Sequence, residues 1–480
     1  MGPVIVWFRR DLRLNDHPAL AEAARSGRPV LPVFIRDKSV VGLGAAPAWR
    51  LEKGLESLSR SLAGIGSRLI LRNGDADDCL DDLILETGAD AVFWTRLYDP
   101  ASKQRDRAIK ASLKSRGVDA RSFSGHLLTE PVRLRTKEGG PFRVYSPFWR
   151  AMVREGIQVD LMPAPKDMRP PERWPASEKL EAWNLGQGMR RGAAVLSRHV
   201  VAGEEAALER LDQFAEGKID GYKSNRDLVS EAGTSGLSPF LSLGEVSPVR
   251  CWARAMHASE SGSPGAGTFM KELAWREFAH HLMHHFPDLG HRNWRDGWES
   301  FPWNLEENRP DVLAWKQGRT GYALIDAAMR ELQVTGTMHN RARMVAASFL
   351  TKHLMTDWRV GLRWFEQHLV DWDTASNAMG WQWVAGCGPD AAPFFRIFNP
   401  ETQAKKFDPD GRYARRWIAE GQADPPSTAM DFFEAIPARW QLSLDMAPAA
   451  PIVELADGRS RALAAYSRLT GKSQDLPNVG

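Results

Sequence analysis

The chain has 480 residues, of which 43% are hydrophobic and 26% charged, as in an ordinary globular protein large enough for two or three domains. No apolar run reaches the ~20 residues of a membrane-spanning helix. A net charge of +3 excludes a polycation that binds nucleic acid over its whole surface. Three scattered cysteines (Cys79, Cys251, Cys387) fit a reducing compartment. We therefore expect a cytoplasmic protein that stays out of the membrane.

The first 130 residues alternate strand and helix patterns. Apolar, β-rich runs predict strands at Val4–Phe8, Val30–Ile35, Arg68–Leu71, Ala91–Thr95 and Ala120–Phe123. Amphipathic segments between them predict helices at Pro18–Ala24, Trp49–Ala63, Asp77–Glu86 and Ser102–Ser115. Continuous apolar strands separated by helices indicate an α/β domain at residues 1–130, with a doubly wound, Rossmann-like parallel sheet. No GxGxxG follows the first strand, so a dinucleotide fingerprint is absent.

The rest of the chain divides into a connector and a helical domain. The proline- and charge-rich segment Leu161–Pro175 is typical of a long loop, and we place an interdomain connector at residues 131–203. Residues 204–480 show helical periodicity, which predicts an all-α domain. Its expected helices are Glu204–Glu216, Pro248–Ser259, Thr268–His285, Ala323–Glu331, Asn340–Met355 and Trp358–His368.

The segment Asp371–Pro400 is rich in indoles and poor in acid–base groups. It contains three tryptophans, two carboxylates at its start, Asn377 in a turn-like run, and Arg396. No serine–histidine pair or metal-ligand spacing accompanies them. Such a segment suits a stacking or redox ligand that carries the chemistry itself. The alternative is a buried aromatic core.

Several motifs, in this order, resemble the photolyase/cryptochrome flavoproteins. They are VWFRRDLRLN (Val6–Asn15), Tyr222 with TSGLS (Thr234–Ser238), KELAWREF (Lys271–Phe278), GYALIDAAM (Gly321–Met329), TMHNRARM (Thr337–Met344) and DWR (Asp357–Arg359). The likeness covers nearly the whole chain and is greatest to bacterial photolyases that repair cyclobutane pyrimidine dimers. It implies an FAD-dependent, light-driven DNA-repair lyase that acts on damaged DNA as a monomer.

Two other functions remain open. One is a blue-light receptor of the cryptochrome type, with the same fold and no repair activity. The chain ends at Gly480, soon after the region of likeness, which favours repair over signalling. The other is a non-catalytic binder of single-stranded nucleic acid that uses aromatic stacking.

The resemblance assigns residues of the chain to the diphosphate of FAD, to its flavin ring and to the rest of the cofactor. Hydroxyls and amides at the start of a helix can hold a diphosphate, and the implied contacts are Tyr222, Thr234, Ser235, Gly236, Leu237 and Ser238. Asn377 is placed at flavin N5, where a neutral amide can hydrogen-bond both redox states. Plant cryptochromes tend to have aspartate there, so asparagine favours repair. The remaining implied contacts are Arg276, Asp371, Asp373 and Arg343, the last a natural ion-pair partner of Asp371.

Two further cofactor features follow from the resemblance. Trp381, Trp358 and Trp303 match the tryptophans that carry electrons from the surface to the flavin, with Trp294 and Trp298 as competitors of Trp303. Core packing is the alternative for all of them. A second, antenna chromophore would be a folate or a deazaflavin. Ala101 and Ser102 stand where one folate-binding subgroup has asparagine and glutamate, so its identity and its presence stay open.

The DNA site is assigned in the same way. Glu272 and Trp275 share one face of a predicted helix, which suits hydrogen bonding to base edges and stacking, and Trp383 would be the second aromatic wall. Asn340 and Met344 stand where (6-4) photolyases carry histidines, one of which donates a proton, so they fit the cyclobutane lesion. The remaining expected DNA contacts are Arg226, Arg341, Arg396, Gln403 and Lys405.

A histidine cluster, His280, His281, His284 and His285, has the HxxxH spacing that can bind zinc. The HExxH pattern of zinc proteases is absent. We interpret the cluster as a packed helix face or a helix near the DNA, and we expect no metal.

Overall fold

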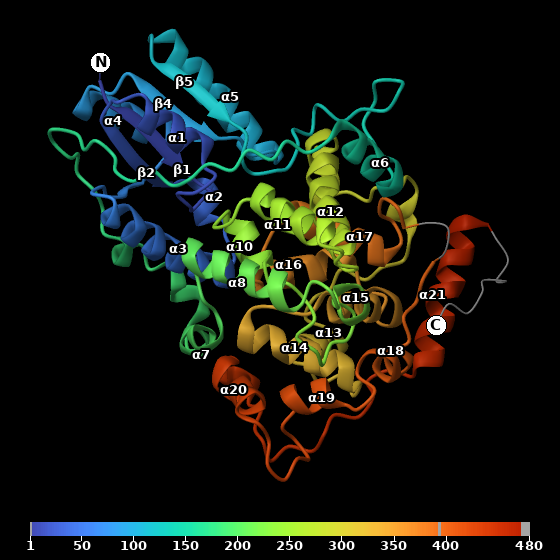
Figure 1. Ribbon diagram of the computed structural model, residues 1–480. Coiled ribbons are helices and arrows are strands. Elements are labelled where there is room, and N and C mark those ends of the chain that lie inside the picture. The colour runs from blue at the N-terminus through green and yellow to red at the C-terminus, as the bar shows by residue number, and fades with distance from the viewer. Residues whose placement is uncertain (1, 392–394, 472–480) are drawn as a thin grey trace. The chain divides into compact units, whose positions relative to one another are not determined.

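The computed structural model describes residues 2–391 and 395–471, which fall into two compact units (Figure 1). Unit 1 comprises Met1–Gly188, Val201–Lys223 and Ser235–Pro287, and unit 2 comprises Met189–Val200, Ser224–Thr234 and Asp288–Gly480. The two units are groups of residues that pack together, and their extents differ from those of the three predicted domains. The domain boundaries at residues 130 and 203 therefore stay predictions.

Unit 1 contains a five-stranded parallel sheet in the order β3-β2-β1-β4-β5. The strands are β1 (Val4–Phe8), β2 (Val30–Arg36), β3 (Ile70–Asn73), β4 (Ala91–Thr95) and β5 (Asp119–Phe123). Strands β2 and β3 are added on one side of β1, and β4 and β5 are then added on the other side of β1. The predicted doubly wound fold is therefore confirmed. Strand β3 begins two residues later than predicted because Ile70 pairs with Val33 and Asn73 with Arg36.

The sheet is covered on both faces. Successive side chains of β1 point to opposite faces, and Phe8 accordingly belongs to one apolar cluster while Trp7 belongs to the other. Leucines of α1 and α3 pack into the first cluster, and leucines of α4 and α5 into the second. These helices are α1 (Pro18–Arg25), α3 (Ala45–Gly64), α4 (Ala76–Thr87) and α5 (Pro100–Ser115).

Helix α12 is the longest of the remaining helices of unit 1. Helices α6 and α11 both pack against α12, which explains why eleven of its residues are buried although its pattern shows little amphipathicity. The helices are α2 (Lys38–Val41), α6 (Tyr145–Glu155), α8 (Glu204–Gly217), α10 (Ser238–Leu243), α11 (Pro248–Glu260) and α12 (Ala266–His285); α9 (Tyr222–Asn225) crosses into unit 2.

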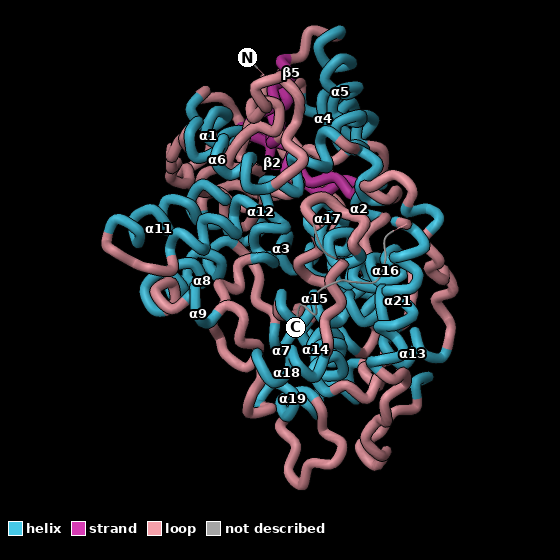
Figure 2. The backbone as a smooth tube through the Cα atoms, turned by 90° about the vertical axis from the view of Figure 1, so that its right-hand side faces the viewer, coloured by secondary structure: helices cyan, strands magenta, loops and turns pink. Residues whose placement is uncertain are grey.

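The described part of unit 2 consists of helices joined by loops, with an isolated bridge between Asn304 and Thr356, whereas the strands lie in unit 1 (Figure 2). Helix α14 is its centre and packs against α7, α15, α18, α19 and α20. The helices are α7 (Gly192–His199), α13 (Pro310–Lys316), α14 (Ala323–Thr335), α15 (Asn340–Ser348), α16 (Trp358–His368), α17 (Thr374–Ala385), α18 (Pro400–Phe407), α19 (Arg412–Trp417), α20 (Ser427–Ala435) and α21 (Leu455–Thr470). Within residues 2–391 and 395–471, every helix is too short or too polar to cross a membrane.

Two local predictions were wrong. One helix was expected over Asn340–Met355. Its α-helical part ends at Ser348, and a π-helical turn, Phe349–His353, follows directly. Asn377 lies inside helix α17 and not in a turn. The Asp373 side chain caps this helix by accepting from the Ser376 N–H at 2.7 Å, and Gly386, in the left-handed conformation, ends it.

Candidate functional site

A pocket of about 160 Å³ in unit 2 brings predicted cofactor residues and predicted lesion residues together. Helices α15, α16 and α17 form its walls. Five residues singled out in the sequence line it: Asn340, Arg343, Met344, Asn377 and Trp381. Asn340 and Met344 lie one turn apart on α15, with Nδ2 of the amide 3.9 Å from the thioether sulfur. They therefore face the pocket from the same side of that helix.

Asn377 is buried and held in one orientation. Its Nδ2 donates to the carbonyl oxygen of Asp373 at 3.0 Å, one turn earlier on the chain. The amide oxygen and the second N–H are therefore left for the pocket. A neutral, fixed amide can donate to or accept from a polar ring held beside it.

An ion pair lies behind the pocket. The Arg343 guanidinium contacts the carboxylate of Asp371 at 2.7 Å, and its Nε donates to the carbonyl of Met338 at 2.8 Å. Asp371 is 5% exposed, so its charge needs this partner. Asp373, 7% exposed, caps α17 with one of its oxygens.

Trp381 closes one side of the pocket. Its ring contacts Phe365 at 4.9 Å and Trp315 at 6.4 Å between centroids, edge to face in both cases. A β-carbon on Gly361 would come within 2.0 Å of the Trp381 ring, so α16 can approach the indole only because that position is glycine. Among the described residues, the buried Nε1 of Trp381 has no hydrogen-bond partner.

The other two tryptophans of the predicted electron-transfer chain are also tied into unit 2. Nε1 of Trp358, which is fully buried, donates to Oδ1 of Asn293 at 2.8 Å. Nε1 of Trp303 donates to the carbonyl of Thr351 at 3.1 Å, and its ring stacks on Trp298 at 5.5 Å. Trp298 is therefore a direct neighbour of Trp303. Which tryptophan ends the electron-transfer chain stays a prediction.

The expected DNA contacts of unit 2 differ in exposure. The Arg396 guanidinium lies over the Trp383 ring at 5.2 Å, and Arg341 pairs with Asp227 at 3.0 Å. Lys405 is exposed and Arg226 is half-buried. Gln403 differs from these, because it is 4% exposed and its Oε1 lacks a partner among the described residues.

In unit 1, α12 carries Glu272, Trp275 and Arg276. Trp275 is half-buried and stacks on Tyr145 with centroids 3.6 Å apart. Arg276 donates to the carbonyl oxygen of His126 at 3.1 Å. The neighbouring Glu277 accepts from the Leu128 and Thr129 N–H groups, and its burial raises its pKa to about 7.

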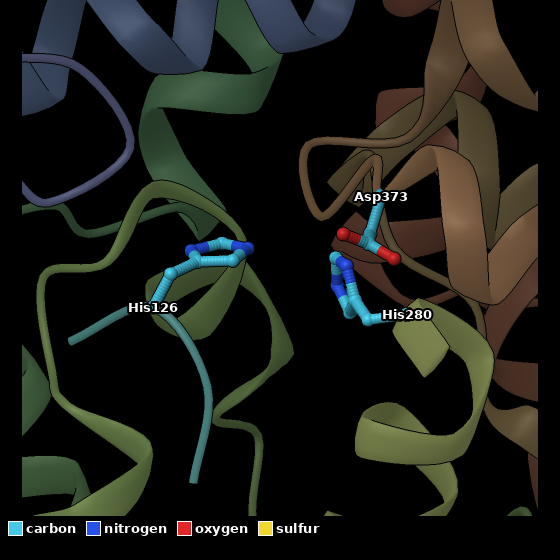
Figure 3. A group of neighbouring side chains, drawn as sticks. All are labelled: His126, His280 and Asp373. Carbon is cyan, nitrogen blue, oxygen red and sulfur yellow. The ribbon is translucent and has the colours of Figure 1, made fainter. Parts of the chain in front are cut away.

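The histidines of α12 form a packed face. His126 and His280 lie side by side with perpendicular rings 5.1 Å apart (Figure 3). Nε2 of His281 accepts from the Phe142 N–H at 3.0 Å, and burial lowers the pKa of His281 to about 3. His281 is therefore neutral at physiological pH and packs as an uncharged aromatic ring.

The predicted diphosphate segment starts a short helix, as expected. Gly236 has a φ of +67°, which few residues other than glycine adopt, and α10 follows from Ser238. The Leu237 N–H donates to Oγ of Ser235 at 3.4 Å. Tyr222 is 7% exposed and packs edge-on against Phe214 and Phe269.

The pocket residues fit the ring system of a flavin. A buried indole N–H without a partner among the described residues, a fixed neutral amide and a paired guanidinium supply donors and acceptors around an aromatic-walled cavity. The described residues that line the pocket include no pair of metal ligands and no nucleophile beside a general base. The α/β sheet and the helical unit with this pocket therefore define a flavoprotein class.

The chain belongs to the DNA photolyase family. Residues 4–169 match the DNA photolyase domain, and residues 269–468 match the FAD binding domain of DNA photolyase. The predicted family and the predicted FAD cofactor are thereby confirmed.

Three similar proteins extend this result. The chain is 48% identical over 472 residues to the deoxyribodipyrimidine photo-lyase of Agrobacterium fabrum, covering 97% of this chain and 98% of the relative. The crystal structure of a bacterial class III photolyase from Agrobacterium tumefaciens matches with a TM-score of 0.89 at 47% identity over 98% of both chains. An archaeal photolyase from Sulfolobus tokodaii, solved with two FAD molecules that imply a novel light-harvesting cofactor, matches with a TM-score of 0.77 at 27% identity over 97% of this chain and 100% of that chain.

Sequence reasoning missed four residues around these sites. Tyr145 stacks on Trp275, His126 contacts Arg276, and Trp315 and Phe365 contact Trp381. All but one of these contacts join residues more than 60 positions apart, beyond the reach of helical or strand periodicity. The exception is Phe365, which one turn of α16 places beside Gly361 and therefore beside the Trp381 ring.

Proposed function

We propose that this protein is a light-driven DNA-repair enzyme that splits cyclobutane pyrimidine dimers with reduced FAD. The observation that carries the proposal is the pocket of unit 2, where Asn377 and Trp381 lie with Asn340 and Met344. The photo-lyase relative supports it, because it is 48% identical to almost the whole chain. We further propose that the enzyme works as a monomer in the cytoplasm, where its three free, buried cysteines would stay reduced.

The chain's own residues would hold and tune the cofactor, whose bound and reduced form supplies light-driven one-electron chemistry. Asn377 would offer its fixed neutral amide to the flavin, and the Arg343–Asp371 pair would hold a balanced charge near it. The segment Thr234–Ser238, with Tyr222, would bind the diphosphate. Arg276 and Asp373 complete the proposed cofactor set.

A flipped dinucleotide would be recognised by stacking and by hydrogen bonds. Trp275 and Trp383 offer aromatic faces, each worth ~1–3 kcal/mol per stacked base. This offsets much of the few-kcal/mol cost of extruding a damaged, poorly stacked pair. Glu272 would hydrogen-bond the base edges and Asn340 would donate its amide. Arg226, Arg341, Arg396 and Lys405 would meet phosphates, with Gln403 nearby, so binding should weaken as salt rises.

The chemistry of the pocket favours the cyclobutane lesion over the (6-4) photoproduct. A cyclobutane ring that opens after one-electron reduction needs no proton donor, whereas (6-4) repair does. Among the described residues that line this pocket there is no imidazole, and Asn340 and Met344 occupy the positions in question. Trp381, Trp358 and Trp303 would carry electrons that keep the cofactor reduced.

The direct test is illumination of the reduced holoprotein with an oligonucleotide that contains one thymine dimer. We expect light-dependent loss of the lesion and none in the dark. Protein that binds FAD but leaves the dimer intact would instead be a light receptor of the cryptochrome type. Purified protein without flavin absorption would point to a nucleic-acid binder and overturn the proposal. Fluorescence excitation of the same sample tests the second, antenna chromophore.

A further inference from the structure

We propose that Tyr145 is a positioning residue for lesion recognition, which fixes the plane of the Trp275 indole so that it presents one defined face to a base. The inference rests on the proposed function, which assigns Trp275 to the lesion. Tyr145 begins helix α6, far in sequence from the predicted cofactor and DNA residues, and neither the motifs nor the resemblance singled it out.

The two rings form a tight parallel stack. Their centroids are 3.6 Å apart and their planes differ by 5°. Phe278 meets both rings nearly edge-on, at 5.9 Å from each, and Phe148 packs behind Phe278 at 5.2 Å. One face of the indole is therefore covered by Tyr145, and the stack is supported by a buried aromatic layer.

A hydrogen bond fixes Tyr145 itself. Its hydroxyl donates to the carbonyl oxygen of Lys271 at 2.8 Å, on the turn of α12 that precedes Trp275, and the residue is 8% exposed. Burial, together with the negative charge of Glu272, raises the pKa of Tyr145 above its ordinary value. The phenol therefore stays neutral and keeps donating across the working pH range.

This arrangement favours a rigid wall over a mobile one. A half-buried indole without a backing ring would lose rotamer freedom whenever a base stacked on it, and that loss weakens binding. With Tyr145 behind it, the ring is ordered before the base arrives. A fixed plane should favour a lesion whose two bases are covalently locked over a normal base that tilts freely.

The test compares Tyr145→Leu, which removes the ring, with Tyr145→Phe, which removes only the hydroxyl. Dissociation constants are measured in the dark for one oligonucleotide with and without a thymine dimer. We expect Tyr145→Leu to weaken binding of the dimer about two- to tenfold, as loss of an aromatic pair implies, with little change for undamaged DNA. Tyr145→Phe should recover most of the loss.

Trp149→Leu is the matched control. Trp149 lies one turn further along the same helix, and its ring packs on Trp252 at 6.2 Å. It should leave the ratio of the two dissociation constants unchanged. FAD content and the thermal midpoint confirm folding of each variant. If Tyr145→Leu does not fold, Tyr145→Met, which also removes the ring and keeps an apolar side chain, replaces it with the same expected loss of dimer binding.

A spectroscopic signature separates positioning from general stability. In protein labelled with 5-fluorotryptophan, the 19F resonance that disappears in Trp275→Phe belongs to Trp275. We expect this resonance to shift in Tyr145→Leu and to stay near its original position in Tyr145→Phe. The ring of Tyr145 would thereby be linked to the environment of the indole.

The failures of the two proposals are distinguishable. If Trp275→Leu weakens dimer binding while Tyr145→Leu binds like the wild type, the positioning role is wrong and the proposed function stands. If Trp275→Leu binds the dimer normally, the assignment of Trp275 is wrong and the inference falls with it. Wild-type protein that neither binds nor repairs dimers would overturn the proposed function itself.

Discussion

The carbonyl oxygen of Asp373 accepts two hydrogen bonds from Asn377, one from its backbone N–H and one from its side-chain Nδ2, both at 3.0 Å. The amide is therefore tied to its own helix, and its oxygen is directed away from that carbonyl. Because Asn377 also lines the pocket, its orientation there is set by α17 before any ligand binds.

The variant Asn377→Asp should lower the midpoint potential of bound FAD. A carboxylate cannot donate to the Asp373 carbonyl, and its charge would repel the anionic reduced cofactor. Two like charges about 4 Å apart repel by about 4 kcal/mol at an effective dielectric constant of about 20, which is an upper bound here. Spectroelectrochemical titration measures the shift. Asn377→Gln, which keeps a neutral amide, is the control, and an unchanged midpoint with full FAD content would contradict the assignment.

Trp381→Phe should abolish photoreduction without abolishing repair. The indole supplies an oxidisable ring beside the pocket, and phenylalanine preserves much of the packing against Phe365 but is far harder to oxidise. Absorption at flavin wavelengths under blue light, with a mild reductant, should show wild-type reduction and none in the variant. Chemically reduced variant should still split dimers.

Trp417→Phe is the control for this experiment, since Trp417 is a buried indole of the same unit outside the predicted chain. It should photoreduce normally. Photoreduction that survives in Trp381→Phe would show that electrons take another route.

Glu272→Ala should reduce repair yield more than dimer binding. Stacking and phosphate contacts supply most of the affinity, whereas the acid stabilises charge that appears only after electron transfer. A hydrogen bond to a charged group contributes about 1.5–3 kcal/mol, so the rate of ring splitting, and with it the yield, should fall about tenfold or more. Yield per bound lesion and binding are measured separately. The wild type should leave a (6-4) photoproduct intact, and its repair, or an undiminished yield in Glu272→Ala, would contradict the proposed pocket.

The strands of the sheet were predicted well from the sequence. The apolar runs of the three inner strands, β2, β1 and β4, show no alternation because both faces of the sheet are buried. Helix α17 was not predicted, because burial also removes the periodic pattern of a helix. It is buried on most sides, from Ala375 to Ala385, so it lacks the amphipathic stripe by which helices are recognised.

The site was predicted as a set of residues, but its contacts required the fold. The Arg343–Asp371 ion pair was expected because the resemblance places both residues at the cofactor and their charges are opposite. The Tyr145–Trp275 stack joins residues on α6 and α12, and no local pattern relates them. The buried position of Gln403 was also invisible, since a glutamine on a short amphipathic helix ordinarily lies at the surface.

A buried lysine leads to a prediction about pH. Nζ of Lys352, in the π-helical turn, donates to the carbonyls of Val384 at 3.0 Å and Arg396 at 3.3 Å, and lies 3.8 Å from the centroid of the Phe395 ring. Burial lowers the pKa of Lys352 from the ordinary 10.5 to about 7. This ammonium therefore links the end of α17 to the segment that carries Arg396.

Between pH 7 and 10.5, the unfolded chain holds a proton at Lys352 that the folded chain has released. The free energy of unfolding of the holoprotein should therefore rise with pH across this window, and this contribution should level off below about 7, where both states are protonated. Lys352→Met removes the ionisable group and should reduce the rise by a few kcal/mol, at about 1.4 kcal/mol per pKa unit. Urea unfolding at several pH values measures it. Lys406→Met, at an exposed position of α18, should leave the slope unchanged. An equal slope in Lys352→Met and the wild type would show that Lys352 stays charged in the folded protein.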